Sequence, residues 1–400
     1  MRTGFISLLA LNAAGVLAAP QATTKAPEVT NRDEISDLAA AAYETAQGLA
    51  KDNTKRASTC NWSNVRVRRE WGTLSKKDKK AYIDAVKCLQ SKPAKTPASF
   101  AAGAKTRFDD FVAIHLNQTT VIHYTGNFLT WHRYFTWLYE EALRNECGYK
   151  GTQPYWDWSL SAISGLNKSP VFDGSDLSLS GDGEYIAGQK DIVLGASMGL
   201  PPIYLKAGSG GGCVKSGPFK DMKVNLGPAA LDLPGGGVAA NPNPLDYNPR
   251  CLKRDLSDSV NRRFANATSV LNNLLQPRTV MDFQMQMQGA PGTGDIGIHG
   301  GGHYSLGGDP GRDVFTSPGD PVFYMHHSMI DRIWWIWQMM SPKDRMQGKT
   351  ALQGTNTFMD MPPSDETTYD DYVNTGWVGP KKQIKDLMST LEGPFCYVYL

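Results

Sequence analysis

The sequence has little of what marks several common protein classes. Its charges almost cancel, with 41 Lys and Arg against 39 Asp and Glu and a formal net charge of +2, so neither a nucleic-acid nor a membrane partner is implied. The six cysteines form no Cys-x-x-Cys pair, which excludes the usual cysteine-based zinc and redox motifs. Beyond Pro20, no apolar run is long enough to span a membrane. Histidine is also scarce, with 7 in 400 residues.

Those few histidines are not scattered along the chain. They fall into two short clusters separated by a long histidine-free segment: His115, His123 and His132, then His299, His303, His326 and His327. One of these histidines taken alone, such as His326, could be an ordinary buried residue of a core helix, with its ring nitrogens hydrogen-bonded. Two clusters that together hold every histidine instead indicate metal ligands, because imidazole is a common ligand for transition metals.

The spacing in the second cluster suits one metal. His299 and His303 are four residues apart, so on a helix they project from nearly one face. The three glycines between them are poor helix formers, but they allow a close approach to the backbone. His327 and Asp331 are also four apart. Since a histidine ligand usually donates its second ring N–H to a carboxylate or carbonyl, we expect Asp331 to orient a histidine.

The first cluster requires a break in the chain. His115 continues the apolar period of Phe108 and Phe111, which places it on the inner face of a helix. His123 and His132 are nine residues apart and would point in opposite directions on one continuous helix. We therefore place His123 on a loop, followed by a second helix that carries His132 and ends near 147–148.

The two clusters also resemble each other. Phe128 precedes His132 by four residues, as Phe323 precedes His327, so in each case an aromatic ring would lie beside a histidine on one helix face. Three imidazoles on each side indicate a two-metal centre between helix pairs. All-nitrogen ligands suit copper, zinc, iron or nickel, and a three-histidine zinc site is known chemistry. Paired all-histidine sites favour dicopper, but the spacing does not choose the metal.

At this point the motifs resemble the two copper regions of the tyrosinase, catechol oxidase and molluscan haemocyanin family. The matching motifs are F-x-x-x-H-R at Phe128–Arg133, P-Y-W-D-W at Pro154–Trp158, H-x-x-x-H at His299–His303, and D-P-V-F-Y-M-H-H-S-M-I-D-R-I-W at Asp320–Trp334. They run in the family's order over about 60–350. The resemblance implies a mainly α-helical fold, in which a four-helix bundle holds a dicopper centre, with long Gly/Pro-rich loops and few short strands.

The resemblance also implies a role for each of these residues. Two copper ions are the expected cofactors. The first would be bound by His115, His123 and His132, and the second by His299, His303 and His327. The side chains expected next to these ligands are those of His326, Asp331, Phe128 and Phe323.

The sequence departs from relatives in this family at two places. Many tyrosinases carry Asn directly after the first histidine of the second copper site, where it holds a water that deprotonates monophenols; here that residue is Gly300. Gly300, Tyr304 and Val314 are expected to line the substrate pocket. Some relatives have a cysteine cross-linked to the second ligand, but Thr119 and Val121 occupy the candidate positions, so we expect no thioether.

The resemblance therefore implies a secreted type-3 dicopper polyphenol oxidase. With O2 it would oxidise o-diphenols or o-aminophenols, and some monophenols, to o-quinones or quinone imines. The main alternative is a haemocyanin-like oxygen-binding protein, which would use the same ligands and block the substrate. A zinc hydrolase is disfavoured, because Gly300 stands where a His-Glu-x-x-His site has its base. A non-catalytic structural protein would leave the two clusters unexplained.

The N-terminal region is expected to be processed in two steps. Residues 1–18 have the charged start, apolar run and small-residue end of a signal peptide. Residues 19–56 are expected to be a propeptide containing an Ala-rich helix, removed by a kexin-like protease after Lys55-Arg56. Residues 57–400 would then form one catalytic domain, and the protein would be extracellular.

Other features fit a secreted protein. Asn61, Asn167 and Asn266 begin glycosylation triplets, and Asn117 begins another, although it lies too close to His115 for us to expect a glycan. An even number of cysteines predicts disulfides, with fifteen possible connectivities. Residues 160–250 are rich in Gly, Pro, Ser and Asp, which predicts long loops with few short strands. The alternating segment 284–288 fits either a strand or the end of the bundle.

Overall fold

The structure is a computed structural model that describes residues 27–53, 60–195 and 199–400. Its α-helices are α1 (Pro27–Asn53), α2 (Lys76–Ser91), α3 (Arg107–Ile122), α4 (Phe128–Cys147), α5 (Trp158–Ser164), α6 (Asp258–Phe264), α7 (Ala267–Leu275), α8 (Val280–Gln288), α9 (Gly297–Leu306), α10 (Val322–Met339) and α11 (Pro342–Met346). The expected mainly helical fold is confirmed, and the undecided segment 284–288 is helical.

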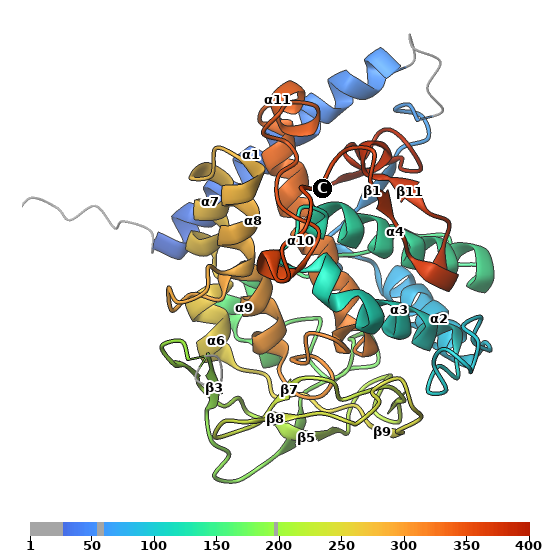
Figure 1. The fold of residues 1–400 in the computed structure, drawn as a ribbon, viewed down its shortest axis with the longest axis vertical. Helices are drawn as coiled ribbons and strands as arrows, with labels where there is room; N and C mark the ends of the chain where they lie inside the picture. The colour runs from blue at the N-terminus through green and yellow to red at the C-terminus, as the bar shows by residue number, and fades with distance from the viewer. Residues whose placement is uncertain (1–26, 54–59, 196–198) are drawn as a thin grey trace, which may run out of the picture.

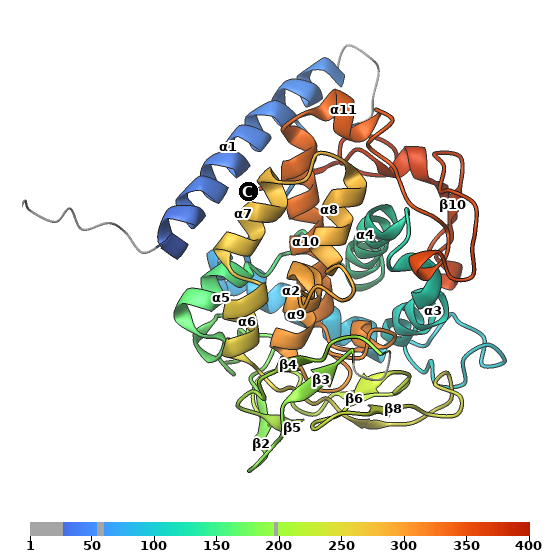
Figure 2. The same cartoon turned by 60° about the vertical axis from the view of Figure 1, so that its left-hand side comes forward.

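The strands are short, and each pairs with one partner. The pairs are β1 (Arg66–Arg68) with β12 (Tyr397–Tyr399), β2 (Gly183–Tyr185) with β5 (Gly211–Val214), β3 (Ile192–Leu194) with β4 (Ile203–Leu205), β6 (Lys223–Val224) with β9 (Arg250–Cys251), β7 (Leu231–Asp232) with β8 (Val238–Ala239), and β10 (Tyr372–Val373) with β11 (Lys382–Gln383). The pairs from β2 to β9 gather at one end of the molecule, below the helices in Figures 1 and 2. This arrangement agrees with the expected long loops over 160–250.

The histidine clusters lie on four helices, α3, α4, α9 and α10, of which α10 is the central one. All eighteen residues of α10 are buried; it packs against α4 and α9, and α3 packs against α4. Thr106 and Asp109 form a capping box that starts α3, and Gly148 in the left-handed conformation ends α4, as a C-terminal glycine commonly does. Figure 1 shows α10 crossing the middle of the molecule between α3/α4 and α8/α9.

The glycines of α9 serve close packing. A Cβ on Gly301 would lie 2.8 Å from Cβ of Phe264 on α6, and a Cβ on Gly302 would collide with the ring of His326 on α10. Both separations are too short for van der Waals contact. The glycine run therefore lets α9 approach two helices at once, although it lowers the intrinsic helix propensity of this segment.

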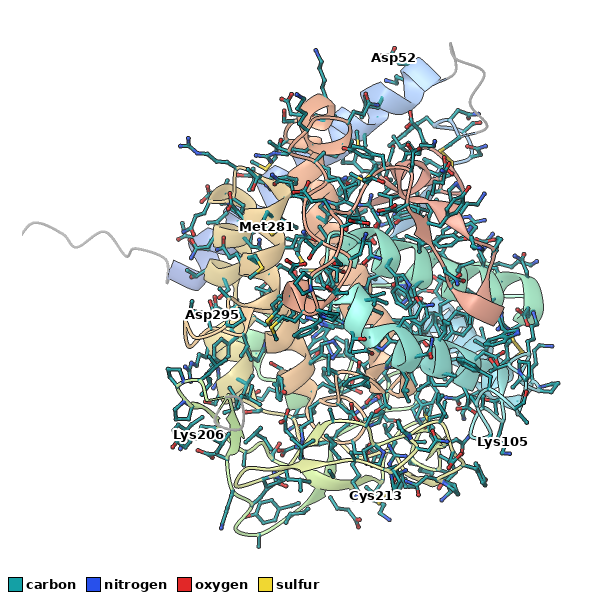
Figure 3. The ribbon with its side chains drawn as sticks, viewed as in Figure 1. Asp52, Lys105, Lys206, Cys213, Met281 and Asp295 are labelled. Atoms are coloured by element: carbon teal, nitrogen blue, oxygen red, sulfur yellow. A yellow bond between two sulfur atoms is a disulfide. The ribbon has the colours of Figure 1, made fainter. Side chains whose placement is uncertain are left out.

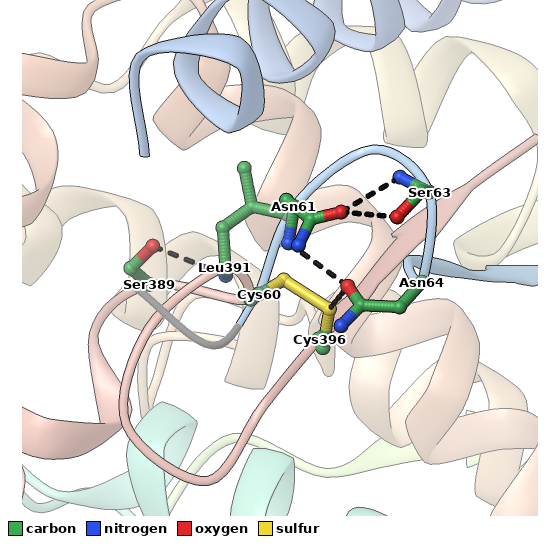
Figure 4. Close-up of a disulfide and its surroundings, with 7 residues drawn as sticks. All are labelled: Cys60, Asn61, Ser63, Asn64, Ser389, Leu391 and Cys396. Atoms are coloured by element: carbon green, nitrogen blue, oxygen red, sulfur yellow. Dashed lines mark hydrogen bonds between the residues drawn. A yellow bond between two sulfur atoms is a disulfide. The ribbon is translucent and has the colours of Figure 1, made fainter. Parts of the chain in front are cut away.

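The two ends of the segment 60–400 are joined beside α10. Parallel strands β1 and β12 pair Arg66 with Tyr397 and Arg68 with Tyr399, and a disulfide links Cys60 to Cys396 (Figure 4). The other disulfides are Cys88–Cys147 and Cys213–Cys251. Every cysteine is therefore paired, which leaves none for a thioether to a histidine.

Helix α1 lies along α7 and α10 (Figure 2). Its side chains Ile35, Ala42, Ala46 and Ala50 are buried, and Arg32 forms an ion pair with Asp157, 3.6 Å away. The helix is slightly longer than the Ala-rich segment expected from the sequence. The expected signal peptide and the Lys55-Arg56 cleavage site lie outside the described residues. Within those residues, no helix is both long and apolar enough to cross a membrane.

Candidate metal centre

The first histidine cluster is assembled by the break between α3 and α4. His115 lies within α3, His123 is the residue at which α3 ends, and His132 lies within α4. The turn at 124–127 lets the two helices face each other, so one ring nitrogen from each histidine lies within 4.8 Å of the others. The expectation that His123 lies on a loop between two helices agrees with this arrangement.

The second cluster joins α9 to α10. His299 and His303 are one turn apart on α9, with ring centroids separated by 4.8 Å. His326 and His327 are adjacent on α10, and the four histidines offer ring nitrogens within 4.8 Å of one another. Atom Nε2 of His327 lies 3.4 Å from Nε2 of His303, so these two rings point at a common position.

Backbone carbonyls fix the orientation of four of the rings. Nδ1 contacts a carbonyl oxygen in each case: His115 with Phe315 (2.9 Å), His123 with Thr119 (2.9 Å), His132 with Phe128 (2.8 Å) and His303 with Gly311 (3.1 Å). A carbonyl only accepts, so Nδ1 carries the proton and Nε2 keeps its lone pair. The Nε2 atoms of His115, His132 and His299 are buried without a hydrogen-bond partner among the described residues, as metal ligands would be before the metal binds.

Burial keeps these imidazoles neutral. Desolvation lowers the pKa of His123 and of His303 to about 4, and it lowers the pKa values of His115, His132 and His299 well below the usual 6.5. Neighbouring histidines lower several of them further, because two imidazolium ions side by side repel each other. The neutral form is the one that binds a metal.

The two clusters face each other directly. The rings of His132 and His327 stack with centroids 4.5 Å apart. Phe128 lies 4.9 Å from His132 and 5.1 Å from His299, while Phe323 lies 4.1 Å from His327 and 5.3 Å from His115. Each phenylalanine thus contacts histidines of both clusters. The aromatic–histidine pairs expected from the four-residue spacing are present on both helices.

His326 and His327 occupy different surroundings. The ring of His327 lies between Phe323 and His132, on the side of the other cluster. That of His326 lies 5.2 Å from Trp158 and 5.6 Å from His299, and neither of its nitrogens has a hydrogen-bond partner among the described residues. The sequence motif favours His327 as the ligand, and its position between the clusters supports that choice.

The expected role of Asp331 is wrong. Its Oδ1 accepts from Nε of Arg133 at 2.6 Å, and its Oδ2 accepts from the hydroxyls of Tyr397 and Tyr399, both at 2.6 Å. Nδ1 of His327 has no hydrogen-bond partner in the described structure. The carboxylate points away from the histidine because the buried guanidinium of Arg133 and two buried hydroxyls compensate its charge better than one neutral imidazole could.

A cavity of about 270 Å³ reaches the histidines from the surface. His123, His299 and His303 line it, and so do the expected pocket residues Gly300, Tyr304 and Val314. The wall is mostly apolar and includes Leu194, Leu200, Ile203, Ile296 and Phe358. Asp295, labelled in Figure 3, lies on the exposed turn before α9. The cavity therefore has the shape and polarity to admit a small aromatic molecule.

Sequence reasoning missed several lining residues. Arg312 lines the cavity, and the hydroxyl of Tyr304 donates to Asp232 Oδ2 at 2.5 Å. Leu194 and Phe358 come from segments far from both histidine clusters. Among these lining residues, only Arg312 had a local signal in the sequence, because it precedes Val314 by two residues. The other lining residues reach the cavity only because distant loops fold over α9.

Three comparisons with known proteins agree with this geometry. The sequence profile of the common central domain of tyrosinase matches residues 105–340. Tyrosinase P of Aspergillus terreus is 42% identical over 334 residues, which are 83% of this chain and 91% of the relative. N-acetyl-6-hydroxytryptophan oxidase of Emericella nidulans is 41% identical over 380 residues, 91% of this chain and 99% of the relative.

Among solved structures, a polyphenol oxidase from Thermothelomyces thermophila superposes with a TM-score of 0.86 at 44% sequence identity. The match covers 94% of this chain and 100% of that one.

Proposed function

Because the chain belongs to the tyrosinase family, a family of copper oxidoreductases that use O2, we propose that it is a secreted polyphenol oxidase. Its substrates are o-diphenols or o-aminophenols, with some monophenols oxidised more slowly, and its products are o-quinones or quinone imines. The observation that carries the proposal is the pair of facing histidine clusters beside an apolar cavity. Three of the proposed ligands, His115, His132 and His299, have a buried Nε2 with no hydrogen-bond partner among the described residues.

The ligands divide between the two copper ions by cluster. His115, His123 and His132 bind one ion, and His299, His303 and His327 bind the other. The residues fit copper, since the donors are neutral imidazoles with no thiolate or carboxylate among them. The copper pair supplies the redox chemistry that couples two-electron oxidation of the substrate to reduction of O2.

The protein's own contribution is to fix and shield the centre. The backbone carbonyls at Thr119, Phe128 and Gly311 hold the rings in place. Phe128 and Phe323 fill the space beside the ligands. The apolar walls of the cavity accept the aromatic ring of the substrate, and burial keeps the imidazoles unprotonated.

Gly300 favours substrates that release a proton easily. It lines the cavity beside His299 and has no side chain to hold a water that could act as a base. Asp295 is the one acidic side chain that lines the cavity in the described part of the chain, and its Oδ1 already accepts from the backbone N–H of Gly297. A catechol needs less assistance than a monophenol, because the neighbouring hydroxyl makes its first proton easier to remove.

The cavity distinguishes this enzyme from an oxygen carrier. A haemocyanin-like protein would use the same ligands but would block access to them. Here the cavity opens to the surface and reaches three of the proposed ligands, His123, His299 and His303. Catalysis is therefore favoured over reversible oxygen binding.

Oxygen uptake by the copper-loaded protein tests the proposal. The panel should contain tyrosol, catechol and 2-aminophenol, together with N-acetyl-6-hydroxytryptophan, which the name of one relative suggests. We expect catechol or 2-aminophenol to be consumed faster than tyrosol. A protein that carries copper and reversibly binds O2 but oxidises none of these compounds would be an oxygen carrier.

We also propose that maturation follows the sequence signals. The signal peptide 1–18 directs secretion, and a kexin-like protease cleaves after Arg56, so that the mature chain starts at Ala57. The three disulfides are consistent with an oxidising compartment. N-terminal sequencing of secreted protein checks this, and a start at Ala19 or Gln21 would show that Lys55-Arg56 is not a processing site.

Three asparagines are the proposed glycosylation sites. Asn167 is exposed, whereas Asn61 and Asn266 are half-buried. The side chain of Asn61 accepts from Ser63, as Figure 4 shows, and that of Asn266 caps α7. Peptide mass mapping before and after glycosidase treatment identifies which of the three carry a glycan.

A further inference from the structure

One buried arginine that lines the cavity has no acid within ion-pair distance among the described residues. Among the described residues six arginines are buried: Arg68, Arg107, Arg133, Arg254, Arg312 and Arg332. The first four form ion pairs within 3 Å, with Glu140, Asp110, Asp331 and Asp320. Arg332, which lies over the ring of Tyr155, also forms no ion pair within 4 Å in the described structure, but it does not line this cavity. Arg312 forms no ion pair within 4 Å in the described structure, although it is only 8% exposed.

Arg312 is held at the wall of the substrate cavity. It precedes Val314 by two residues and follows Gly311, whose carbonyl contacts Nδ1 of His303. Its Nε donates to the backbone carbonyl of Asp232 at 2.8 Å. No other side-chain hydrogen bond of Arg312 occurs among the described residues, so the two terminal amino groups of the guanidinium keep their donors free.

Among the described residues no acid forms an ion pair with Arg312, although the carboxylates of Asp255, Asp232 and Asp309 favour its charge from farther away. The carboxylate of Asp232 accepts instead from the hydroxyl of Tyr304. The other charged residue that lines the cavity is Asp295, which is exposed on the turn before α9. The remaining wall consists of apolar side chains, histidines, and uncharged polar groups. Burial still makes the charged guanidinium less favourable than it would be in water, and an anion that entered the cavity would offset that cost.

We propose that Arg312 binds a carboxylate of the substrate, so that the preferred substrates are catechols or o-aminophenols that carry an acid group. A guanidinium and a carboxylate form two parallel charge-assisted hydrogen bonds, which give both affinity and orientation. The apolar walls then hold the ring with its reacting groups toward the histidines. This inference rests on the proposed polyphenol oxidase activity and names the substrate class for that activity.

Matched pairs of acid and methyl ester test the proposal. The pairs are 3-(3,4-dihydroxyphenyl)propanoic acid and 3-amino-4-hydroxybenzoic acid, each with its methyl ester, at a pH where the acids are ionised. With the copper-loaded enzyme we expect kcat/KM to be about tenfold or more higher for the acid, mainly through KM, which is the effect of one charge-assisted hydrogen bond. The ratio of acid to ester should fall about tenfold in Arg312→Gln and less in Arg312→Lys.

Arg263→Gln is the matched control. Arg263 is an exposed arginine that contacts the backbone of Tyr204 and Gly294 and does not line the cavity, so removing its charge should leave the ratio unchanged. The assignment would be overturned if the unmodified enzyme had equal kcat/KM for acid and ester, or if Arg312→Gln left their ratio unaltered. Either result would leave the polyphenol oxidase function intact. If the copper-loaded enzyme oxidised neither the acids nor the esters, both the assignment of Arg312 and the proposed polyphenol oxidase function would be contradicted.

Discussion

Replacing Asp331 with Asn separates two roles that this residue could have. The sequence spacing assigns it to the orientation of His327, which would make copper binding depend on it. The structure instead places its carboxylate among Arg133, Tyr397 and Tyr399. We therefore expect Asp331→Asn to lower the free energy of unfolding and to leave the copper content of the folded protein at the level of the unmodified chain.

The size of the loss follows from the partners. Removing one charge from a buried ion pair destabilises a protein by about 3–5 kcal/mol. Arg68 contacts Asp331 at 3.4 Å but keeps its closer bonds to Glu140, at 2.7 and 2.9 Å, so most of the loss comes from Arg133. Asparagine also retains one acceptor. We expect about 3 kcal/mol for Asp331→Asn, and about 1 kcal/mol for loss of a hydroxyl in Tyr397→Phe or Tyr399→Phe.

Urea unfolding followed by tryptophan fluorescence, with copper analysis of the folded fraction, measures both quantities. The control is Asp84→Asn, which breaks an exposed ion pair with Lys80 and should change stability by less than about 1 kcal/mol. If Asp331→Asn instead lost copper while its unfolding free energy stayed within error of the unmodified protein, the carboxylate would act on the histidine and our interpretation of the network would be refuted.

Three further predictions concern the centre and its surroundings. His326→Ala should retain more copper than His327→Ala by metal analysis; the reverse order would exchange the two roles. Gly300→Asn should raise oxygen uptake on a monophenol relative to the matching catechol, because the amide can hold a water. The Cβ of the new side chain would meet Ile296 at 3.0 Å. A lower rate of oxygen uptake with both substrates would therefore show that the side chain blocks the cavity. Burial, helped by Asp157, raises the pKa of Glu70 from 4.5 to about 7. As the pH rises, the unfolded chain therefore loses this proton before the folded protein does, and the free energy of unfolding falls between about pH 4.5 and 7. At pH 8 the Glu70→Gln variant should be more stable than the unmodified protein by up to about 3 kcal/mol. Equal stability curves against pH for the two proteins would contradict this.

The sequence was sufficient for the parts of the site that depend on local spacing. The four-residue separation of His299 and His303 and the break after His123 place each imidazole on its element. The same reasoning misassigned Asp331, since its partners Arg68 and Tyr399 are remote in sequence and local spacing carries no information about them. It left the segment 284–288 undecided because alternating Gln and Met residues satisfy a strand pattern as well as a partly buried helix.

Long-range packing determined the remaining features. The disulfide pairing could not be chosen among fifteen connectivities until Cys60 and Cys396 were brought together by strands β1 and β12. Arg312 could be recognised as part of the cavity only when the loop before α10 was placed beside β7, where Asp232 accepts its Nε–H. Helix α1 belongs to the segment that we propose is removed during maturation, and its burial against α7 and α10 in this structure could not be read from its weak apolar pattern.

Metal analysis of the purified protein tests the central claim most directly. The account predicts two copper ions per folded chain, and a loss of copper when any one of His115, His123, His132, His299, His303 and His327 is replaced by Ala. One copper ion per chain, zinc in place of copper after growth with both metals, or two copper ions retained in any of the six variants would contradict the proposed centre.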